Sequence, residues 1–388
     1  MDRSFVLRLS ALVLCLVVLY ALPGAACSIK KKSYGAPGSG GNKMFVVTTD
    51  YTSGSYATVD ASTHAAASNI AAIDSDAVAR VYNGLVWVIN RTGENNITVV
   101  DPTQGYAVIN QFTTNDPGGP ASNPQDIEFV SLTKAYITRY EQNTILIVNP
   151  SNGAQLGTIN LSSLLNPDPG TEPADTDGIV EMAGACIHNA TLYVTVERLD
   201  RANYYTPVGH SYIAVIDTAT DTLTGSIQLT YANPSGDLRY IPSLDRIATV
   251  CSGSFGVADG AIEMIDPTSN TDDGAMLLET SLNGDFDDFV VDSATQGYVL
   301  YNDFSYNLKV QRFNPTTLTP SGTDVVAVSG FNLSGLALTP DGKQLYVGDR
   351  TGVNPGIRIY DTTTSNDAEI TTNPIPTGLP PFEIDYVP

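Results

Sequence analysis

A seven-fold repeat constrains this sequence more than any other feature. A β-rich run ends in Asp or Asn and is followed by small turn-forming residues, and this pattern recurs at intervals of 41, 48, 68, 49, 48 and 47 residues. Asp and Asn side chains cap tight turns through the backbone that follows them, so each marks a hairpin rather than a catalytic group. The seven anchor residues are Asp60, Asp101, Asn149, Asp217, Asp266, Asn314 and Asp361.

Each repeat contains four short apolar runs, and helical periodicity is nearly absent. A four-stranded antiparallel unit of this length, repeated four to eight times, is typical of a β-propeller. A blade of this kind buries its faces only by stacking against its neighbours. We therefore predict an all-β, seven-bladed β-propeller of four-stranded antiparallel blades over residues 43–388.

The two ends of this region predict how the ring closes. The first repeat supplies only three strands, beginning at Met44, while residues 382–387, "FEIDYV", alternate between apolar and acidic side chains. Chain ends usually fray unless something holds them. We predict that the C-terminal strand pairs with the N-terminal blade and closes the ring.

Two of the blades resemble a known family. The segments are "TLYVTVE" (191–197) with "YIAVIDTATDTLTGSIQL" (212–229), and "LALTPDGKQLYVGD" (336–349) with "GIRIYDTTT" (356–364). They resemble the YVTN-type, YncE-like seven-bladed propellers of exported bacterial proteins. The resemblance implies the fold of residues 43–388 and leaves the function open, because such propellers include ligand binders, DNA binders, scaffolds and enzymes.

The N-terminus is typical of an export signal. Arg3 and Arg8 precede the apolar run "LSALVLCLVVLYAL", and small residues follow it. We predict a cleaved signal peptide over residues 1–26 rather than a spanning helix, because the run is short for a bilayer. The sequence "GAAC" resembles a bacterial lipobox, which implies lipidation of Cys27; ordinary cleavage just before Cys27 is the alternative.

Residues 27–42 are predicted to be a lipidated, flexible tether. Lys30 to Lys32 suit an anionic membrane surface, and the Gly/Ser/Pro run after them is a flexible spacer. We expect a chain that is lipid-anchored in the cell envelope, at the outer membrane or cell surface. A soluble periplasmic or secreted protein is the alternative.

The excess of acidic residues limits the classes of partner that the chain is expected to bind. The chain has 41 acidic and 19 basic residues and a net charge of −22, which becomes −23 when residues 1–26 remove two arginines and one aspartate. Such a domain repels nucleic-acid phosphates and anionic membranes. We therefore expect no nucleic acid, membrane contact through the lipid anchor only, a monomer, and an envelope protein or glycan as partner.

Acidic residues are expected where the innermost strands begin, around one mouth of the central channel. Six of the seven aligned residues are acidic: Asp76, Asp126, Asp177, Asp237, Asp288, Gly335 and Glu383. Carboxylates this close require raised pKa values or a bound cation. Ca²⁺ is the first candidate, because it prefers oxygen ligands. The alternative is that each side chain caps its own strand and faces water.

The 68-residue spacing marks an enlarged blade with insertions at residues 166–178 and 198–211. Long loops on a rigid scaffold are common binding elements. The first insertion predicts a loop site that includes Asp168, Glu172 and Asp175. An EF-hand is rejected because Pro173 and Gly184 occupy its terminal ligand positions, which leaves an irregular Ca²⁺ site as one reading.

The second insertion combines basic, aromatic and imidazole side chains that suit a protein or glycan partner, a solvated loop being the alternative. These residues are Arg198, Arg201, Tyr204, Tyr205 and His210.

Of the four cysteines, Cys186 and Cys251 lie beyond the signal and the predicted cleavage site. An exported location permits a disulfide between them, two free thiols being the alternative. Cys186 and His188 are two residues apart, but buried structural roles are the commoner use of such residues, so no soft-metal site is predicted.

The sequence contains neither a CxxCH haem motif nor a GxSxG hydrolase motif, and its three histidines, His64, His188 and His210, are scattered along the chain. The first hypothesis is a non-catalytic cell-envelope lipoprotein that acts as a binding or scaffold module, with a cation at the acidic channel mouth. A Ca²⁺-dependent propeller hydrolase or lactonase is the alternative.

Overall fold

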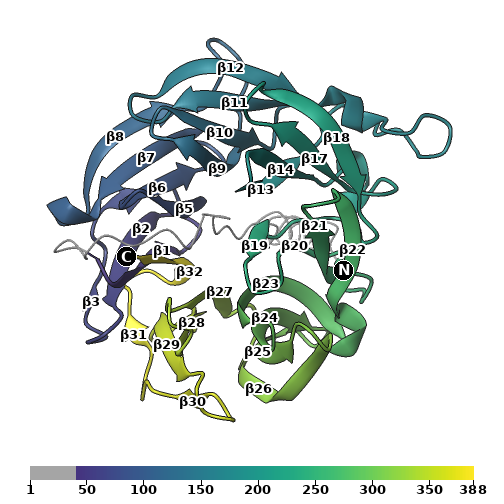
Figure 1. The fold of residues 1–388 in the computed structure, drawn as a ribbon. Helices are drawn as coiled ribbons and strands as arrows, with labels where there is room; N and C mark the ends of the chain where they lie inside the picture. Colours follow the sequence, from purple (N-terminus) through teal and green to yellow (C-terminus); the bar gives the residue numbers. More distant parts are fainter. Residues whose placement is uncertain (1–40) are drawn as a thin grey trace, which may run out of the picture.

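The computed structural model describes residues 41–388, which form seven large antiparallel sheets arranged in a ring about a central axis, here called the channel although buried side chains fill it (Figure 1). The predicted all-β, seven-bladed β-propeller is thereby confirmed. The predicted signal peptide, Cys27 and nearly all of the predicted tether lie outside the described residues. Within residues 41–388, no helix is long and apolar enough to cross a membrane.

Blades one to four contain the following strands, each blade given from the channel to the rim. Blade one has β32 (Pro381–Val387), β1 (Lys43–Thr49), β2 (Gly54–Asp60) and an outer edge of β3 (Ala66–Ala67) and β4 (Ala72–Ile73). Blade two has β5 (Ala77–Tyr82), β6 (Leu85–Asn90), β7 (Asn96–Asp101) and β8 (Ala107–Thr113). Blade three has β9 (Pro124–Ser131), β10 (Lys134–Arg139), β11 (Thr144–Asn149) and β12 (Ala154–Asn160). Blade four has β13 (Met182–His188), β14 (Thr191–Val196), β17 (Tyr212–Asp217) and β18 (Thr222–Gln228), with a small hairpin of β15 (Leu199–Asp200) and β16 (Thr206–Pro207).

Blades five to seven follow the same order. Blade five has β19 (Arg239–Ile241), β20 (Arg246–Cys251), β21 (Ala261–Asp266) and β22 (Thr271–Leu278). Blade six has β23 (Gly284–Ser293), β24 (Gln296–Asp303), β25 (Asn307–Asn314) and β26 (Thr319–Ser329). Blade seven has β27 (Leu333–Leu338), β28 (Gln344–Asp349), β29 (Gly356–Asp361) and an outer edge of β30 (Ala368–Glu369) and β31 (Ile375–Pro376). The short 3₁₀ helices are η1 (Pro102–Gln104), η2 (Ser162–Leu165), η3 (Arg201–Asn203) and η4 (Glu279–Ser281).

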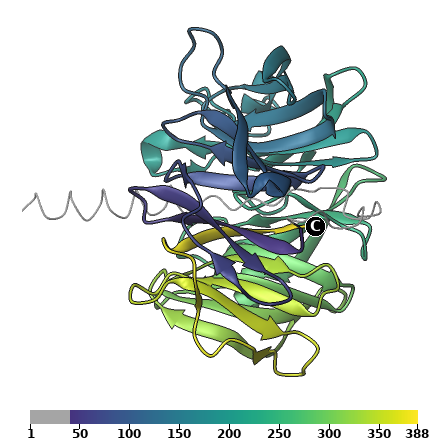
Figure 2. The ribbon, with the colours of Figure 1, turned by 90° about the vertical axis from the view of Figure 1, so that its left-hand side faces the viewer.

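The ring closes between the two ends of the described chain. Strand β32 pairs antiparallel with β1, so that Tyr386 lies opposite Met44 and Ile384 lies opposite Val46. Figures 1 and 2 both show the yellow β32 beside the purple β1. Ile384 is 2% exposed and belongs to the same core cluster as Met44 and Val46. The predicted closure is confirmed.

All seven anchor residues cap their turns as the repeat predicts. The side chain of each accepts a hydrogen bond of 2.7–3.0 Å from the backbone N–H two residues further on. Each anchor therefore fixes the turn between the third and outer strands of its blade.

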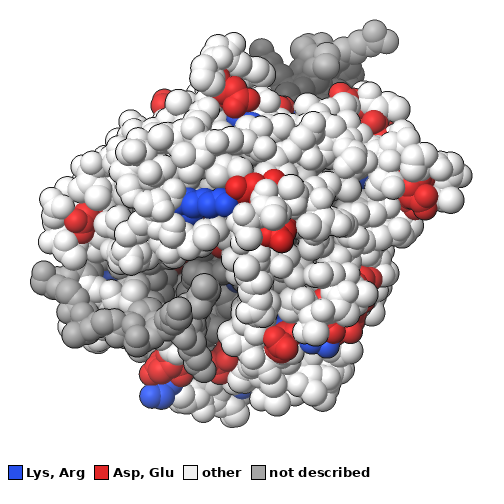
Figure 3. Space-filling model, turned by 45° about the horizontal axis from the view of Figure 1, so that its top comes forward, with Lys and Arg blue, Asp and Glu red and all other residues white. Residues whose placement is uncertain are grey.

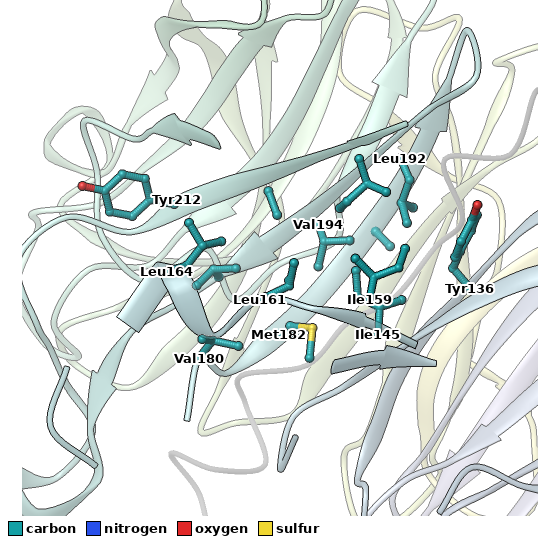
Figure 4. Close-up of a cluster of buried hydrophobic side chains, with 14 of the residues drawn as sticks. Tyr136, Ile145, Ile159, Leu161, Leu164, Val180, Met182, Leu192, Val194 and Tyr212 are labelled. Atoms are coloured by element: carbon teal, nitrogen blue, oxygen red, sulfur yellow. The ribbon is translucent and has the colours of Figure 1, made fainter. Parts of the chain in front are cut away.

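Neighbouring blades pack through apolar clusters, and the cluster between blades three and four also holds the long link 161–181 (Figure 4). Ile145 comes from blade three and Leu192 from blade four, while Leu161, Leu164 and Val180 come from the link. All five side chains are buried. The link is therefore anchored near both of its ends.

The links between blades and the turns between second and third strands lie on one side of the ring, because neighbouring strands within a blade are antiparallel. We name this side the link face. Hydrogen bonds join links to turns there: Asn95, in the turn of blade two, accepts from the N–H groups of Ser122 (3.0 Å) and Asn123 (2.7 Å) in the link to blade three.

We expect Ile384→Ala to lower the free energy of unfolding by about 2–5 kcal/mol, because it removes buried methyl groups at the closure and leaves a cavity. Urea unfolding at equilibrium measures the change. The control is Ile370→Ala, at a side chain that is 43% exposed, where we expect a change within about 0.5 kcal/mol. Equal losses at both positions would contradict a closure that stabilises the ring.

Candidate functional site

One arginine crosses the channel and joins four blades. Arg80 of β5 lies 2.7 Å from Asp126 of blade three, 2.9 Å from Glu383 of blade one and 3.4 Å from Asp237 of blade five, measured between side-chain nitrogen and oxygen atoms. All four side chains are buried. A second arginine, Arg239, pairs with Asp237 at 2.7 Å and with Asp288 of blade six at 3.0 Å. Because Asp237 belongs to both groups, the five blades form one charged network.

Three of these carboxylates also bind the next blade through its backbone. Glu383 accepts from the N–H of Ala79 (2.5 Å) and Asp126 accepts from the N–H of Ala185 (2.9 Å). Asp288 accepts from the N–H of Leu336 (2.8 Å). Each of these bonds joins two inner strands, from blade one to two, three to four, and six to seven.

A β-bulge directly precedes each of the three carboxylates that bind the next blade. Each bulge contains one residue without a cross-strand partner: Gln125, Asp287 or Phe382. A bulge redirects the side chain that follows it, and here it aims the carboxylate toward the neighbouring inner strand. In blade seven the corresponding bulge residue is Gly335, with a φ of +57°, and an added Cβ would lie 2.9 Å from the carbonyl oxygen of Phe382.

Burial dominates the protonation of the network. Desolvation raises the pKa of Asp237 to about 8, against the opposing charges of Arg239 and Arg80. Desolvation likewise raises the pKa of Glu383 well above its usual value. The pKa of Arg80 is lowered by burial and raised by its three carboxylate partners, and it ends well above the usual value.

The structure brings together four of the six acidic residues predicted at the channel: Asp126, Asp237, Asp288 and Glu383. The other two do not join this network. Asp76 immediately precedes β5 and pairs with Arg91, and Asp177 lies in the enlarged link 161–181, five residues before β13.

Sequence reasoning missed the two arginines that compensate the channel carboxylates. Arg80 lies within the apolar strand "AVARVY". A buried guanidinium requires buried carboxylates, so this arginine was the feature of the sequence that could have predicted the network.

A second acidic group lies in the enlarged blade four. Asp175 and Asp177 come from the link 161–181, and Glu181 comes from its last position before β13. One carboxylate oxygen from each lies within 4.8 Å of the others, and within residues 41–388 no other set of three Asp, Glu, His or Cys side chains meets this spacing. Asp175 is 6% exposed and Glu181 is fully buried, while Asp177 faces the surface.

The hydrogen bonds of this group are incomplete. Glu181 accepts from Nε of Arg201 (2.7 Å) and from the N–H of Leu199 (3.1 Å), so both of its oxygens have partners. Asp175 Oδ1 accepts from the N–H of Asp177 at 3.3 Å, but its buried Oδ2 has no hydrogen-bond partner. Burial, with the charge of Asp177 next, raises the pKa of Asp175 to about 6. Burial raises the pKa of Glu181 to about 8.

Two arginines fasten the second insertion to the first. Arg198, fully buried, donates to the carbonyl oxygens of His210 and Pro173. Arg201 donates to Glu141 in blade three at 2.6 Å, in addition to Glu181. Arg198 therefore holds the β15–β16 hairpin at its base, and Arg201 holds the loop between its two strands, in which Tyr204 is 75% exposed.

The residues predicted for loop binding separate in the structure. Asp175 joins the acidic group, and Glu172 pairs with His210 at 2.7 Å. Asp168 is exposed, and its carbonyl oxygen accepts from the N–H groups of Thr171 and Glu172. Glu181, which completes the acidic group, was not predicted.

Cys186 and Cys251, whose pairing the sequence leaves open, do not form a disulfide with each other. Cys251 is a free, buried thiol whose sulfur lies 3.2 Å from Oε2 of Glu263. Burial, followed by the charge of Glu263, raises its pKa well above the usual value. Cys186 is itself disulfide-bonded, so both cysteines are accounted for without pairing to each other.

On the face drawn in Figure 3, carboxylates are scattered in small groups, with fewer basic side chains among them. The acidic group of blade four and the tip of its hairpin are both on the link face, since the link 161–181 and the turn between β14 and β17 lie there.

Comparison with protein-family models and with curated proteins gives no match. Solved structures do match. A putative 6-phosphogluconolactonase from Bacteroides fragilis aligns with a TM-score of 0.60 at 12% identity, covering 91% of this chain and 100% of that chain. Kuenenia stuttgartiensis hydrazine synthase aligns with a TM-score of 0.56 at 15% identity, covering 77% and 85%. Dihydro-heme d1 dehydrogenase NirN aligns with a TM-score of 0.54 at 12% identity, covering 94% and 79%.

At these identities the similarity establishes the fold alone. The chain is a seven-bladed β-propeller, a class whose members include proteins of different activities. The similarity therefore assigns no functional residue to this chain.

We expect Arg80→Met to lower the free energy of unfolding by at least about 3 kcal/mol, because it leaves three buried carboxylates without their shared cation. The loss should be smaller at pH 5 than at pH 8, since protonation of Asp237 and Glu383 becomes easier. Urea unfolding at both pH values measures it. The control is Lys343→Met, since Lys343 pairs with Asp341 at the surface with side chains 65% and 56% exposed. A loss at position 80 no larger than the loss at position 343 would contradict this role.

We also expect the unmodified protein to be more stable at pH 5 than at pH 8. Burial raises the pKa of both Asp237 and Glu279 to about 8. Between about pH 4.5 and 8 the folded chain therefore holds protons that the unfolded chain releases, and stability falls as the pH rises. Unfolding in urea with chelator present, at several pH values, checks the sign. Rising stability over this interval would contradict it.

Proposed function

We propose that this chain is a non-catalytic binding or scaffold module of the cell envelope, which holds a protein or glycan partner with the insertions of blade four. The observation that carries the proposal is the hairpin β15–β16. It lies on the link face, is fastened by Arg198 and Arg201, and exposes Tyr204 in the loop between its strands. A loop that is held in place and exposes an aromatic side chain suits binding with little loss of conformational entropy.

The strain in the hairpin supports the same role. Arg198, Tyr204 and Tyr205 all have positive φ values, between 57° and 58°. Such conformations are unfavourable for large side chains and persist where the surroundings impose them, as they do at binding and switch regions. Here the hydrogen bonds of Arg198 and the cap that Asp200 gives to Ala202 (3.0 Å) and Asn203 (3.1 Å) impose them.

The location of the protein is part of the proposal. The export signal and the lipobox-like "GAAC" favour a lipid anchor on Cys27, and both lie outside the described residues. The excess of acidic residues favours a partner that is neutral or basic, because a second anionic surface would be repelled.

We expect a photoreactive phenylalanine analogue in place of Tyr204 to cross-link one discrete partner in intact envelopes. The same analogue at Val353, 86% exposed in the turn of blade seven on the same face, is the control and should give no such adduct. Gel shifts and mass spectrometry of the full-length protein measure both. Adducts that are absent at position 204, or equal at both positions, would overturn the proposed binding element. Chelator-sensitive turnover of a lactone or ester would favour a hydrolase instead.

A further inference from the structure

We propose that Asp175, Asp177 and Glu181 bind one divalent cation, Ca²⁺ before any other, and that this ion joins the two insertions of blade four. The three carboxylates come from a single link and already place one oxygen each within 4.8 Å of the others. Hard divalent cations take carboxylate oxygens, and backbone carbonyl groups and water complete their coordination.

The unpartnered oxygen of Asp175 is an independent sign of a missing ligand. Asp175 is 6% exposed and its Oδ2 forms no hydrogen bond, although Oδ1 is bonded to the N–H of Asp177. Buried polar atoms in native proteins nearly always have partners, and each exception requires a cause. A cation beside Oδ2 supplies the partner that the protein does not.

The charges around the group also lack compensation. Glu197 is fully buried nearby, its Oε2 accepts from the hydroxyl of Tyr140 at 3.2 Å, and its Oε1 has no partner. Arg201 is the cation in contact with the group, and it also serves Glu141. One guanidinium therefore contacts two carboxylates, Glu141 and Glu181, with Asp175, Asp177 and Glu197 close by.

The donor atoms of the three side chains indicate which kind of metal ion would bind. The group contains oxygen donors only, and the nearby imidazole of His210 is occupied by Glu172 at 2.7 Å. Zinc and copper prefer nitrogen and sulfur ligands, while Mg²⁺ requires a nearly regular octahedron and keeps much of its water. An irregular link with carboxylates at Asp175, Asp177 and Glu181 fits the flexible coordination of Ca²⁺.

Binding here would connect the link to the hairpin. Glu181 already accepts from the N–H of Leu199 in β15, and Asp177 accepts from the N–H of Arg201, at 3.3 Å, in the loop between β15 and β16. An ion on the same carboxylates would fix the hairpin relative to the ring. This consequence rests on the proposed partner-binding role, whereas the ion site does not.

Titration of the full-length, chelator-treated and dialysed protein with CaCl₂ tests the site. We expect one Ca²⁺ per chain by calorimetry, and an affinity at least about ten-fold lower in Asp175→Asn and in Glu181→Gln. The control is Asp168→Asn, at an exposed carboxylate of the same link, which should bind like the unmodified protein. MgCl₂ in place of CaCl₂ should bind more weakly.

A second measurement distinguishes loss of binding from a folding defect. Tb³⁺ replaces Ca²⁺ and is excited through nearby tyrosines such as Tyr140. It should luminesce with the unmodified protein and with Asp168→Asn but not with Asp175→Asn, and all three proteins should give the same circular dichroism spectrum. Absence of Ca²⁺ binding to the unmodified protein, or equal binding by Asp175→Asn, would overturn the site. The cross-linking from position 204 is read without added metal, so its failure can be told apart from failure of the ion site.

Discussion

The ion pairs of Arg80 are the interaction on which the ring depends. In a propeller each blade contacts only its two neighbours, except where a side chain crosses the axis. Arg80 extends from blade two and contacts carboxylates of blades one, three and five. Buried pairs of this kind add little net stability, because desolvation offsets their attraction, but losing one partner is strongly unfavourable. We interpret the network as fixing the number and spacing of the blades, while the apolar clusters between blades supply most of the free energy of folding.

Features that depend on residues close together in the sequence could be predicted, whereas features that depend on contacts between distant residues could not. The turn anchors and strand alternation depend on neighbouring residues, so the blade count, the hairpins and the pairing of β32 with β1 were predictable. Asp126, Asp237, Asp288 and Glu383 were predictable as channel residues for the same reason. Asp177 was aligned with them although the long link 161–181 places it five residues before β13, and Asp76, directly before β5, pairs with Arg91 instead of joining the network. The cross-axis partners of Arg80 depend on closure of the whole ring, and only the unusual arginine in a buried strand hinted at them.

The two acidic groups of this protein illustrate how a structural carboxylate differs from one that awaits a ligand. In the channel, Asp126 and Glu383 each have both an arginine and a backbone N–H of the next blade as partners. Their burial is therefore explained by the fold itself. In blade four, Asp175 is almost as deeply buried but keeps one oxygen without a partner. Raised pKa values occur in both groups, so they do not separate the two cases. Asp126 and Glu383 differ from Asp175 in that both oxygens of each side chain accept hydrogen bonds.

The topology also decides which way a tethered ring would present its insertions. Strand β1 begins at Lys43 on the face opposite the link face, because β1 runs toward the turn that joins it to β2. An anchor on Cys27 would therefore be joined to the opposite face. The acidic group and the tip of the β15–β16 hairpin would then point away from the attachment point, toward the compartment in which a partner diffuses. If the proposed anchor is present, this geometry is compatible with a partner reaching the insertions of blade four from the side opposite the attachment.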